Sequence, residues 1–158
     1  MTQRVELATV MDRLAVDAVI TGYAVAVDDG DWTAYQALFT PDGRADYRSA
    51  GGIEGPAREV AGWLAEMLSM FPVRQHLIVN RRLELEDLDG YTGDSAVLQA
   101  DYLNPMRLDR PGGTNGDAGA PNFVTGGRYT FGLVRRDDGA WRVRRVTVHE
   151  KWRRTGAP

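Results

Sequence analysis

The stretch Val73-Arg74-Gln75-His76-Leu77-Ile78-Val79-Asn80 marks the point where helical spacing of apolar residues ends and strand-like alternation begins. Pro72 stands immediately before it and closes the preceding helical pattern. With a period of two, one face of the stretch carries Arg74, His76, Ile78 and Asn80. An imidazole, an amide and an apolar side chain on one face suit the wall of a pocket for a small organic molecule. Periodicity alone is equally compatible with a structural histidine, so both interpretations stay open.

Upstream of this stretch the spacing of apolar residues predicts three helices. The first covers residues 5–27 and ends at Asp28-Asp29-Gly30, because glycine can adopt the left-handed cap; its apolar residues are Leu7, Val10, Leu14, Ile20, Tyr23 and Val27. The second begins at Asp31 as N-cap and stops at the turn Pro41-Asp42-Gly43. A short strand over 44–49 precedes the third helix over 57–69, whose apolar stripe is Val60, Trp63, Leu64, Met67 and Leu68.

Downstream, strand patterns cover residues 73–87, 94–108, 122–136 and 141–153. Residues 109–121 are rich in glycine and proline and are predicted to form a flexible loop that can act as a lid. Three N-terminal helices followed by consecutive strands indicate an α+β fold, with the helices packed on a highly curved, mainly antiparallel sheet. Such a sheet wrapped over a long helix leaves a cone-shaped cavity, and residues 1–158 are predicted to form a single domain.

The composition excludes several classes of function. Hydrophobic residues make up 43% of the chain and charged residues 26%, and the net charge of −3 gives no field that favours nucleic acid. The absence of cysteine rules out disulfides and thiolate chemistry, and two histidines far apart in sequence argue against a metal site. No targeting or membrane-spanning pattern is present, so we expect a cytoplasmic protein without membrane or nucleic-acid partners.

Polar side chains occur where the cavity lining is expected to be apolar. The candidates are Tyr23, Asp28, Tyr47, His76, Asn80, the face Tyr102, Asn104 and Met106, the face Arg128 and Thr130, and Trp63 and Met67 on the third helix. A carboxylate can fix the tautomer of an imidazole, the imidazole can move a proton, and phenols can polarise an oxygen. No phosphate-binding glycine loop and no serine-nucleophile motif is present, so no cofactor is expected. His149 is expected at the surface or rim.

Several motifs resemble the NTF2-like superfamily, and within it the SnoaL-like branch that includes scytalone dehydratase. They are Tyr23-x4-Asp28-x2-Asp31-Trp32, Leu38-Phe39-x-Pro41-Asp42-Gly43, Asp46-Tyr47-Arg48-Ser49, Gln75-His76 and Asp138-Gly139-x-Trp141-Arg142-Val143. The resemblance covers residues 5–153 and implies an NTF2-like (cystatin-like) cone. It also implies that Asp28 orients His76 as the catalytic imidazole and that Tyr47 is one of two phenols. This chain departs from the pattern at the other phenol, Val27, at a second histidine, Met106, and at a polar pair replaced by Arg128 and Thr130.

Two hypotheses of different classes follow. The first is a cofactor-independent lyase or isomerase, similar to a dehydratase or cyclase, that uses Asp28 and His76 as general acid and base on a small aromatic or polyketide-like molecule. The alternative is a catalytically inactive module that binds a small ligand or supports oligomerisation. Contact between Asp28 and His76 inside a closed cavity distinguishes the two. The resemblance also implies a homo-oligomer, either a dimer or a trimer.

Overall fold

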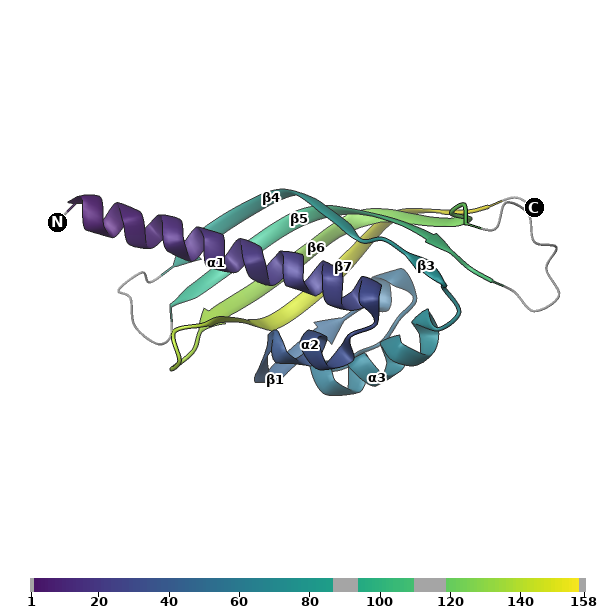
Figure 1. Ribbon diagram of the computed structural model, residues 1–158, viewed down its shortest axis with the longest axis horizontal. Coiled ribbons are helices and arrows are strands. Elements are labelled where there is room, and N and C mark those ends of the chain that lie inside the picture. The colour runs from purple at the N-terminus through teal and green to yellow at the C-terminus, as the bar shows by residue number, and fades with distance from the viewer. Residues whose placement is uncertain (1, 87–93, 110–118, 157–158) are drawn as a thin grey trace.

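The computed structural model describes residues 2–86, 94–109 and 119–156. The helices are α1 Thr2–Asp29, α2 Trp32–Ala37 and α3 Ala57–Leu68, with a 3-10 turn, η1, at Arg48–Ala50. The strands are β1 Phe39–Asp46, β2 Glu54–Pro56, β3 Val73–Arg74, β4 Leu77–Glu86, β5 Ser95–Arg107, β6 Phe123–Arg135 and β7 Trp141–Thr155. The expected α+β cone is confirmed: three helices pack on a strongly curled mixed sheet (Figure 1). No helix in the described ranges has the length and apolar character needed to cross a membrane.

The sheet has the order β2-β1-β7-β6-β5-β3, and β4 also pairs with β5. All neighbouring strands are antiparallel except β1 and β7, which run parallel. In Figure 1, α1 lies along the length of the sheet, while α2, α3 and β1 gather beneath the C-terminal end of α1. The end of α1, α3 and the inner faces of β5 to β7 line a common cavity.

The N-terminal half of α1 differs from the expected pattern. Leu7, Val10 and Leu14 are exposed, whereas Val16 and Ile20 are fully buried. Leu14 and Val16 are two residues apart, which places their side chains about 200° apart around the helix axis. The predicted stripe therefore mixed two faces of the helix, and only its C-terminal part packs against the sheet.

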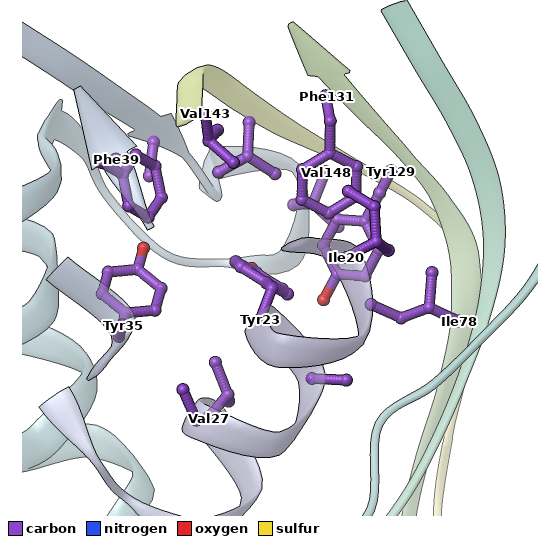
Figure 2. Close-up of a cluster of buried hydrophobic side chains, with 14 of the residues drawn as sticks. Ile20, Tyr23, Val27, Tyr35, Phe39, Ile78, Tyr129, Phe131, Val143 and Val148 are labelled. Carbon is purple, nitrogen blue, oxygen red and sulfur yellow. The ribbon is translucent and has the colours of Figure 1, made fainter. Parts of the chain in front are cut away.

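The core forms where the C-terminal half of α1 meets the sheet. Figure 2 shows Tyr23 of α1 between Tyr35 of α2 and Tyr129 of β6, with Phe131 of the same strand close by. The ring centroid of Tyr23 lies 5.8 Å from that of Tyr35, 5.7 Å from that of Tyr129 and 5.2 Å from that of Phe131. Tilted and edge-to-face aromatic packing of this kind adds to the free energy gained by burying the rings.

The helix boundaries follow the local signals. Gly30 adopts φ 67° directly after α1, and the Asp31 side chain caps α2 by accepting a hydrogen bond from the amide of Ala34 at 2.9 Å. The turn Pro41-Asp42-Gly43 was wrongly predicted to stop α2. That helix ends earlier, and the turn lies inside β1, where the register with β7 shifts between Phe39 and Arg44.

Bulges in β4 and β7 alter which side chains face inward. In β4, Asn80 and Arg81 both lie opposite Ala100, and Asn80 adopts φ 52°. In β7, Arg144 and Lys151 fall outside the pairing with β6. Each extra residue reverses the alternation beyond it and bends the strand, which increases the curl of the sheet.

The remaining elements depart from prediction in small ways. The strand expected over 44–49 ends at Asp46 and is followed by η1, the strand expected over 73–87 is split into β3 and β4, and β2 was not predicted. Of the flexible loop predicted over 109–121, residues 110–118 lie outside the described residues.

Candidate active site

A cavity of about 360 Å³ lies between the end of α1, η1, α3 and the inner faces of β5, β6 and β7. Its wall is mainly aromatic and aliphatic; it consists of Tyr23, Val27, Tyr47, Ala50, Gly51, Gly52, Trp63, Leu64, Met67, Leu68, Met70, Phe71, His76, Tyr102, Asn104, Met106, Leu108, Phe123, Thr125, Tyr129, Val148, Glu150 and Arg153. A concave apolar space with a few polar groups is typical of a site for a small organic ligand.

Asp28 and His76 form a hydrogen-bonded pair at this cavity. Asp28 lies in the last turn of α1, and His76 lies in the break between β3 and β4. Nδ1 of His76 is 2.6 Å from Oδ1 of Asp28, and the backbone amide of His76 donates to Oδ1 at 3.1 Å and to Oδ2 at 2.9 Å. The side chain of His76 is 8% exposed and that of Asp28 is 21% exposed. Three contacts between two elements therefore fix the imidazole relative to the carboxylate.

This geometry sets the proton positions on the ring of His76. A carboxylate accepts hydrogen bonds, so Nδ1 is the protonated nitrogen of the neutral imidazole and Nε2 carries a lone pair. Nδ1 is occupied by Asp28, and His76 belongs to the cavity wall. Nε2 is thus the ring atom available to accept a proton from a ligand.

The hydroxyl of Tyr47, in the wall of the same cavity, contacts two other phenols. Its oxygen lies 2.6 Å from the hydroxyl oxygen of Tyr23 and 2.8 Å from that of Tyr35. Burial raises the pKa of Tyr23 and of Tyr47 well above the ordinary value, and neighbouring phenols raise both further. Both side chains therefore stay protonated at neutral pH and can donate hydrogen bonds. Tyr23 lies one helical turn before Val27, so α1 supplies a phenol from a position other than the one that the resemblance indicated.

Most of the residues predicted for the site meet at the cavity. His76, Tyr47, Tyr23, Trp63, Met67, Tyr102, Asn104 and Met106 all contribute to the wall, and Asp28 contacts it through His76.

Three of the predicted residues lie outside the cavity wall, so the inward face expected for them was wrong. They are Asn80, Arg128 and Thr130. Asn80 follows the point where β4 bulges, and its amide contacts Asp101 at 3.2 Å. Arg128 forms an ion pair with the same carboxylate at 2.8 Å. Thr130 pairs with Gln99, and its neighbours Tyr129 and Phe131 face inward. The predicted face of β6 was therefore the outer one.

The prediction missed Thr125, Tyr129, Glu150 and Arg153 in the wall. Thr125 and Tyr129 lie on the inner face of β6, opposite to the one chosen. Glu150 and Arg153 both reach the cavity because the bulge at Lys151 separates them by three residues rather than two. The sequence carried a signal for this bulge in the pair Gly126-Gly127, because paired glycines in a strand indicate a bulge or a close backbone approach. A Cβ on Gly127 would collide with the carbonyl oxygen of His149.

Glu150 and Arg153 form an ion pair on the wall. Nε and Nη2 of Arg153 donate to the two carboxylate oxygens of Glu150, each at 3.0 Å, and Nη2 also donates to the carbonyl of Ala50 at 2.8 Å. The guanidinium lies 5.1 Å from the ring centroid of Phe123. This pair therefore joins β7 to η1 across one side of the cavity. His149, beside it in sequence, is exposed.

Across residues 2–86, 94–109 and 119–156, no three histidine, aspartate or glutamate side chains lie close enough together to hold a metal ion. The groups at the cavity that could contact a ligand include an imidazole, phenols, an amide and two carboxylates, each carboxylate already paired with a basic side chain.

A helix-backed cone that encloses an apolar cavity with an aspartate–histidine pair defines the class as NTF2-like. The chain belongs to the SnoaL-like family: the family model for the SnoaL-like domain matches residues 8–147. The uncharacterized protein Rv2910c of Mycobacterium tuberculosis is 34% identical over 141 residues, which cover 89% of this chain and 86% of that protein.

Solved structures agree with this fold. A putative scytalone dehydratase from Novosphingobium aromaticivorans superposes with a TM-score of 0.76 at 18% identity, covering 100% of this chain and 93% of that one. The hexachlorocyclohexane dehydrochlorinase LinA-type3 from Novosphingobium barchaimii superposes with a TM-score of 0.74 at 18% identity, covering 96% and 94%. The resemblance to the NTF2-like superfamily is thereby confirmed.

Proposed function

We propose that this protein is a cofactor-independent lyase or isomerase that uses His76 as general base and acid on a small aromatic or polyketide-like molecule. The observation that carries the proposal is the 2.6 Å contact between Nδ1 of His76 and Asp28 at the wall of an apolar cavity. General acid–base catalysis needs such a positioned imidazole within hydrogen-bond reach of the substrate. The names of two structural neighbours, a dehydratase and a dehydrochlorinase, are compatible with elimination chemistry.

The proposed elimination begins when Nε2 of His76 accepts a proton from a substrate carbon. The electron pair of the broken C–H bond becomes the new double bond, and the leaving group departs from the adjacent carbon with its own bonding pair. Asp28 stabilises the imidazolium through Nδ1, and the proton can then be passed to a departing hydroxide to form water. Isomerisation uses the same first step, but the proton returns to a different carbon.

Tyr23 and Tyr47 are proposed to donate hydrogen bonds to the substrate oxygen. Their short mutual contact places two phenols side by side in the wall, and their raised pKa values keep both hydroxyl groups protonated. Hydrogen-bond donors held in a water-poor site stabilise the negative charge that develops on an enolate oxygen.

Proton exchange at carbon provides a test. Small aromatic ketones, beginning with 2-tetralone, would be incubated in D₂O with the wild-type protein or with His76→Ala, and deuterium incorporation next to the carbonyl would be followed by NMR. We expect exchange above the buffer rate for the wild type only. Equal exchange by both proteins would contradict the role of His76. A wild-type protein that binds these ketones without exchanging any of them would support the ligand-binding module instead.

Asp31→Asn is the matched control, because Asp31 lies three residues after Asp28 in the sequence but caps α2 rather than contacting His76. Asparagine also caps helices well, so this variant should exchange deuterium at the wild-type rate. The homo-oligomeric state and the cytoplasmic location remain predictions, and sedimentation of the purified protein would decide the first of these.

A further inference from the structure

Helix α1 has a second apolar face, on the side turned away from the sheet that it covers in Figure 1. Val16 and Ile20 are fully buried against the sheet. Leu7 and Val25 each lie nine residues from Val16, which places their side chains about 180° away around the helix axis. Leu7 is nevertheless 62% exposed and Val25 is 52% exposed. Apolar residues on two opposite sides of one helix are typical of a helix that is covered on both sides.

The residues of this second face recur with the spacing of a coiled coil. From Leu7 onwards they follow one another at alternating intervals of four and three residues, which is a heptad spacing. All of them are exposed and none is charged. They form the α1 seam, which consists of Leu7, Met11, Leu14, Ala18, Thr21 and Val25. A heptad spacing keeps these side chains in line along a second helix, because two helices wound around each other repeat in this way.

The seam has a polar border on one side and small residues on the other. On the polar side, Asp17 forms an ion pair with Arg81, and Arg81 also donates a hydrogen bond to the hydroxyl of Thr21 at 3.1 Å. On the opposite side Ala8 and Ala15 are exposed. The distance between two packed helices depends on the side chains at their contact, so alanines allow a close approach. An apolar strip with a polar rim is the usual anatomy of a protein–protein interface.

The exposed apolar area is sufficient for an interface between two copies. Met11 is 60% exposed, Leu14 is 63% exposed and Val10, beside the seam, is 50% exposed. Together with Leu7 and Val25 these side chains expose roughly 500 Å² of apolar surface, which is similar to the largest patch on a typical monomer, and such patches are often functional. Two copies would bury about 1,000 Å² in total, the area at which specific interfaces begin.

The charges beside the seam favour a second copy over a membrane surface. A helix that lies on an anionic membrane carries many lysine and arginine side chains on its polar face. The flank of α1 instead carries Glu6, Arg13 and Asp17, which have mixed signs. An uncharged seam with such a border offers no attraction for a strongly charged partner either. The same seam on a second molecule is its best complement, because a two-fold axis brings identical patches together.

We propose that the α1 seam is a dimer interface, occupied by α1 of a second copy related by a two-fold axis. The proposal gives the expected homo-oligomer a contact face and a symmetry, and it does not depend on the proposed chemistry. Tyr23 and Val27 of the same helix belong to the cavity wall and lie on the buried side of α1. The two cavities would therefore lie on opposite outer sides of the helix pair.

Sedimentation velocity of the full chain tests the proposal, with Leu14→Glu and Met11→Glu as seam variants. Both positions are exposed in one copy, and glutamate forms helices about as well as leucine and methionine, so the fold should survive. We expect the wild type to sediment with twice the 17.5 kDa mass of one chain. Each variant brings glutamates together across the seam and should raise the dissociation constant of the dimer by at least about a hundredfold. Circular dichroism would verify that the helices remain.

Leu103→Glu is the matched control, because Leu103 is a comparably apolar residue, 38% exposed, on the outer face of β5 rather than on α1. It should leave the dimer intact. An assembly that Leu103→Glu dissociates while both seam variants leave it unchanged would overturn the proposal and assign the interface to the sheet. A wild-type protein that stays monomeric up to about 100 μM would overturn it as well. Flotation of such a monomer with phosphatidylglycerol vesicles, lost in Leu14→Glu, would assign the seam to a membrane surface instead.

Discussion

The two acid–base pairs at the cavity differ in how they are built. Asp28 and His76 are 48 residues apart, come from different elements, and have side chains that are 21% and 8% exposed. Glu150 and Arg153 lie three residues apart on one strand, and their side chains are 13% and 38% exposed, so the difference lies in the base rather than in the carboxylate. Water screens the second pair more than the first. The pair with the more buried base is therefore the one to which we assign the proposed chemistry, whereas the wetter pair fastens η1 to β7.

The largest expected effect separates the two pairs by activity. Asp28→Asn keeps the size of the side chain but removes its charge, so the imidazolium loses its stabilising partner. Turnover should fall by roughly 10²–10⁴. Glu150→Gln makes the corresponding change in the other pair and should lower turnover by less than about tenfold. Initial rates on a substrate found in the exchange screen would measure both, and similar losses would erase the proposed distinction.

The free energy of unfolding should separate the linked phenols from the other tyrosines of the cavity. Tyr47→Phe removes the hydroxyl that contacts both Tyr23 and Tyr35, leaving two buried hydroxyl groups without this partner. We expect a loss of about 2 kcal/mol in the free energy of unfolding, measured by urea denaturation. Tyr102→Phe removes a cavity hydroxyl that does not join two phenols and should cost about half as much or less. An unchanged free energy of unfolding for Tyr47→Phe would mean that the phenol cluster contributes little to the stability of the fold.

A smaller effect on the unfolding free energy is expected for the more exposed pair, Glu150 and Arg153. Arg153→Met keeps a long apolar side chain but removes the guanidinium, and with it the ion pair with Glu150, the hydrogen bond to Ala50 and the contact with the Phe123 ring. Because exposed ion pairs contribute little, the unfolding free energy should fall by less than about 1 kcal/mol, and by still less in high salt. A larger, salt-independent loss would show that this pair behaves like a buried one.

The last expected effect lies outside the cavity and appears only in acid. A hydrogen bond from Arg48 lowers the pKa of Asp46 to about 2, so in mild acid the folded state binds fewer protons at this carboxylate than the unfolded state does. Stability from Asp46 is thus present above the unfolded pKa of roughly 3.9 and is lost as the pH falls towards 2. Denaturation at several pH values should show a weaker acid dependence for Asp46→Asn. An identical profile would exclude Asp46 as a contributor.

Local signals in the sequence predicted the elements that frame the cavity. Gly30 and Asp31 mark the boundary between α1 and α2, and Pro72 marks the change from helices to strands; the structure confirms all three. The contact of Asp28 with His76 was implied by the resemblance rather than by local signals, and the structure brings the two side chains together. Their role in catalysis remains a proposal.

Two of the errors arise where a strand departs from regular alternation. The bulge at Asn80 takes that side chain out of the predicted face, and the bulge at Lys151 brings Arg153 inward. A period of two assumes uninterrupted pairing, so it cannot locate an extra residue. Asparagine is enriched among residues with positive φ, and Gly126-Gly127 faces the second bulge, so both sites carried a weak signal.

A double-mutant cycle of Asp28→Asn and His76→Ala tests the central claim most directly. The rate of the reaction found in the exchange screen would be measured for the wild type, both single variants and the double variant. If the two residues act as one unit, either single change removes most of the activity and the second removes little more, so the losses are far from additive. Losses that simply add, or a His76→Ala protein with wild-type turnover, would contradict the proposal that this pair performs the chemistry.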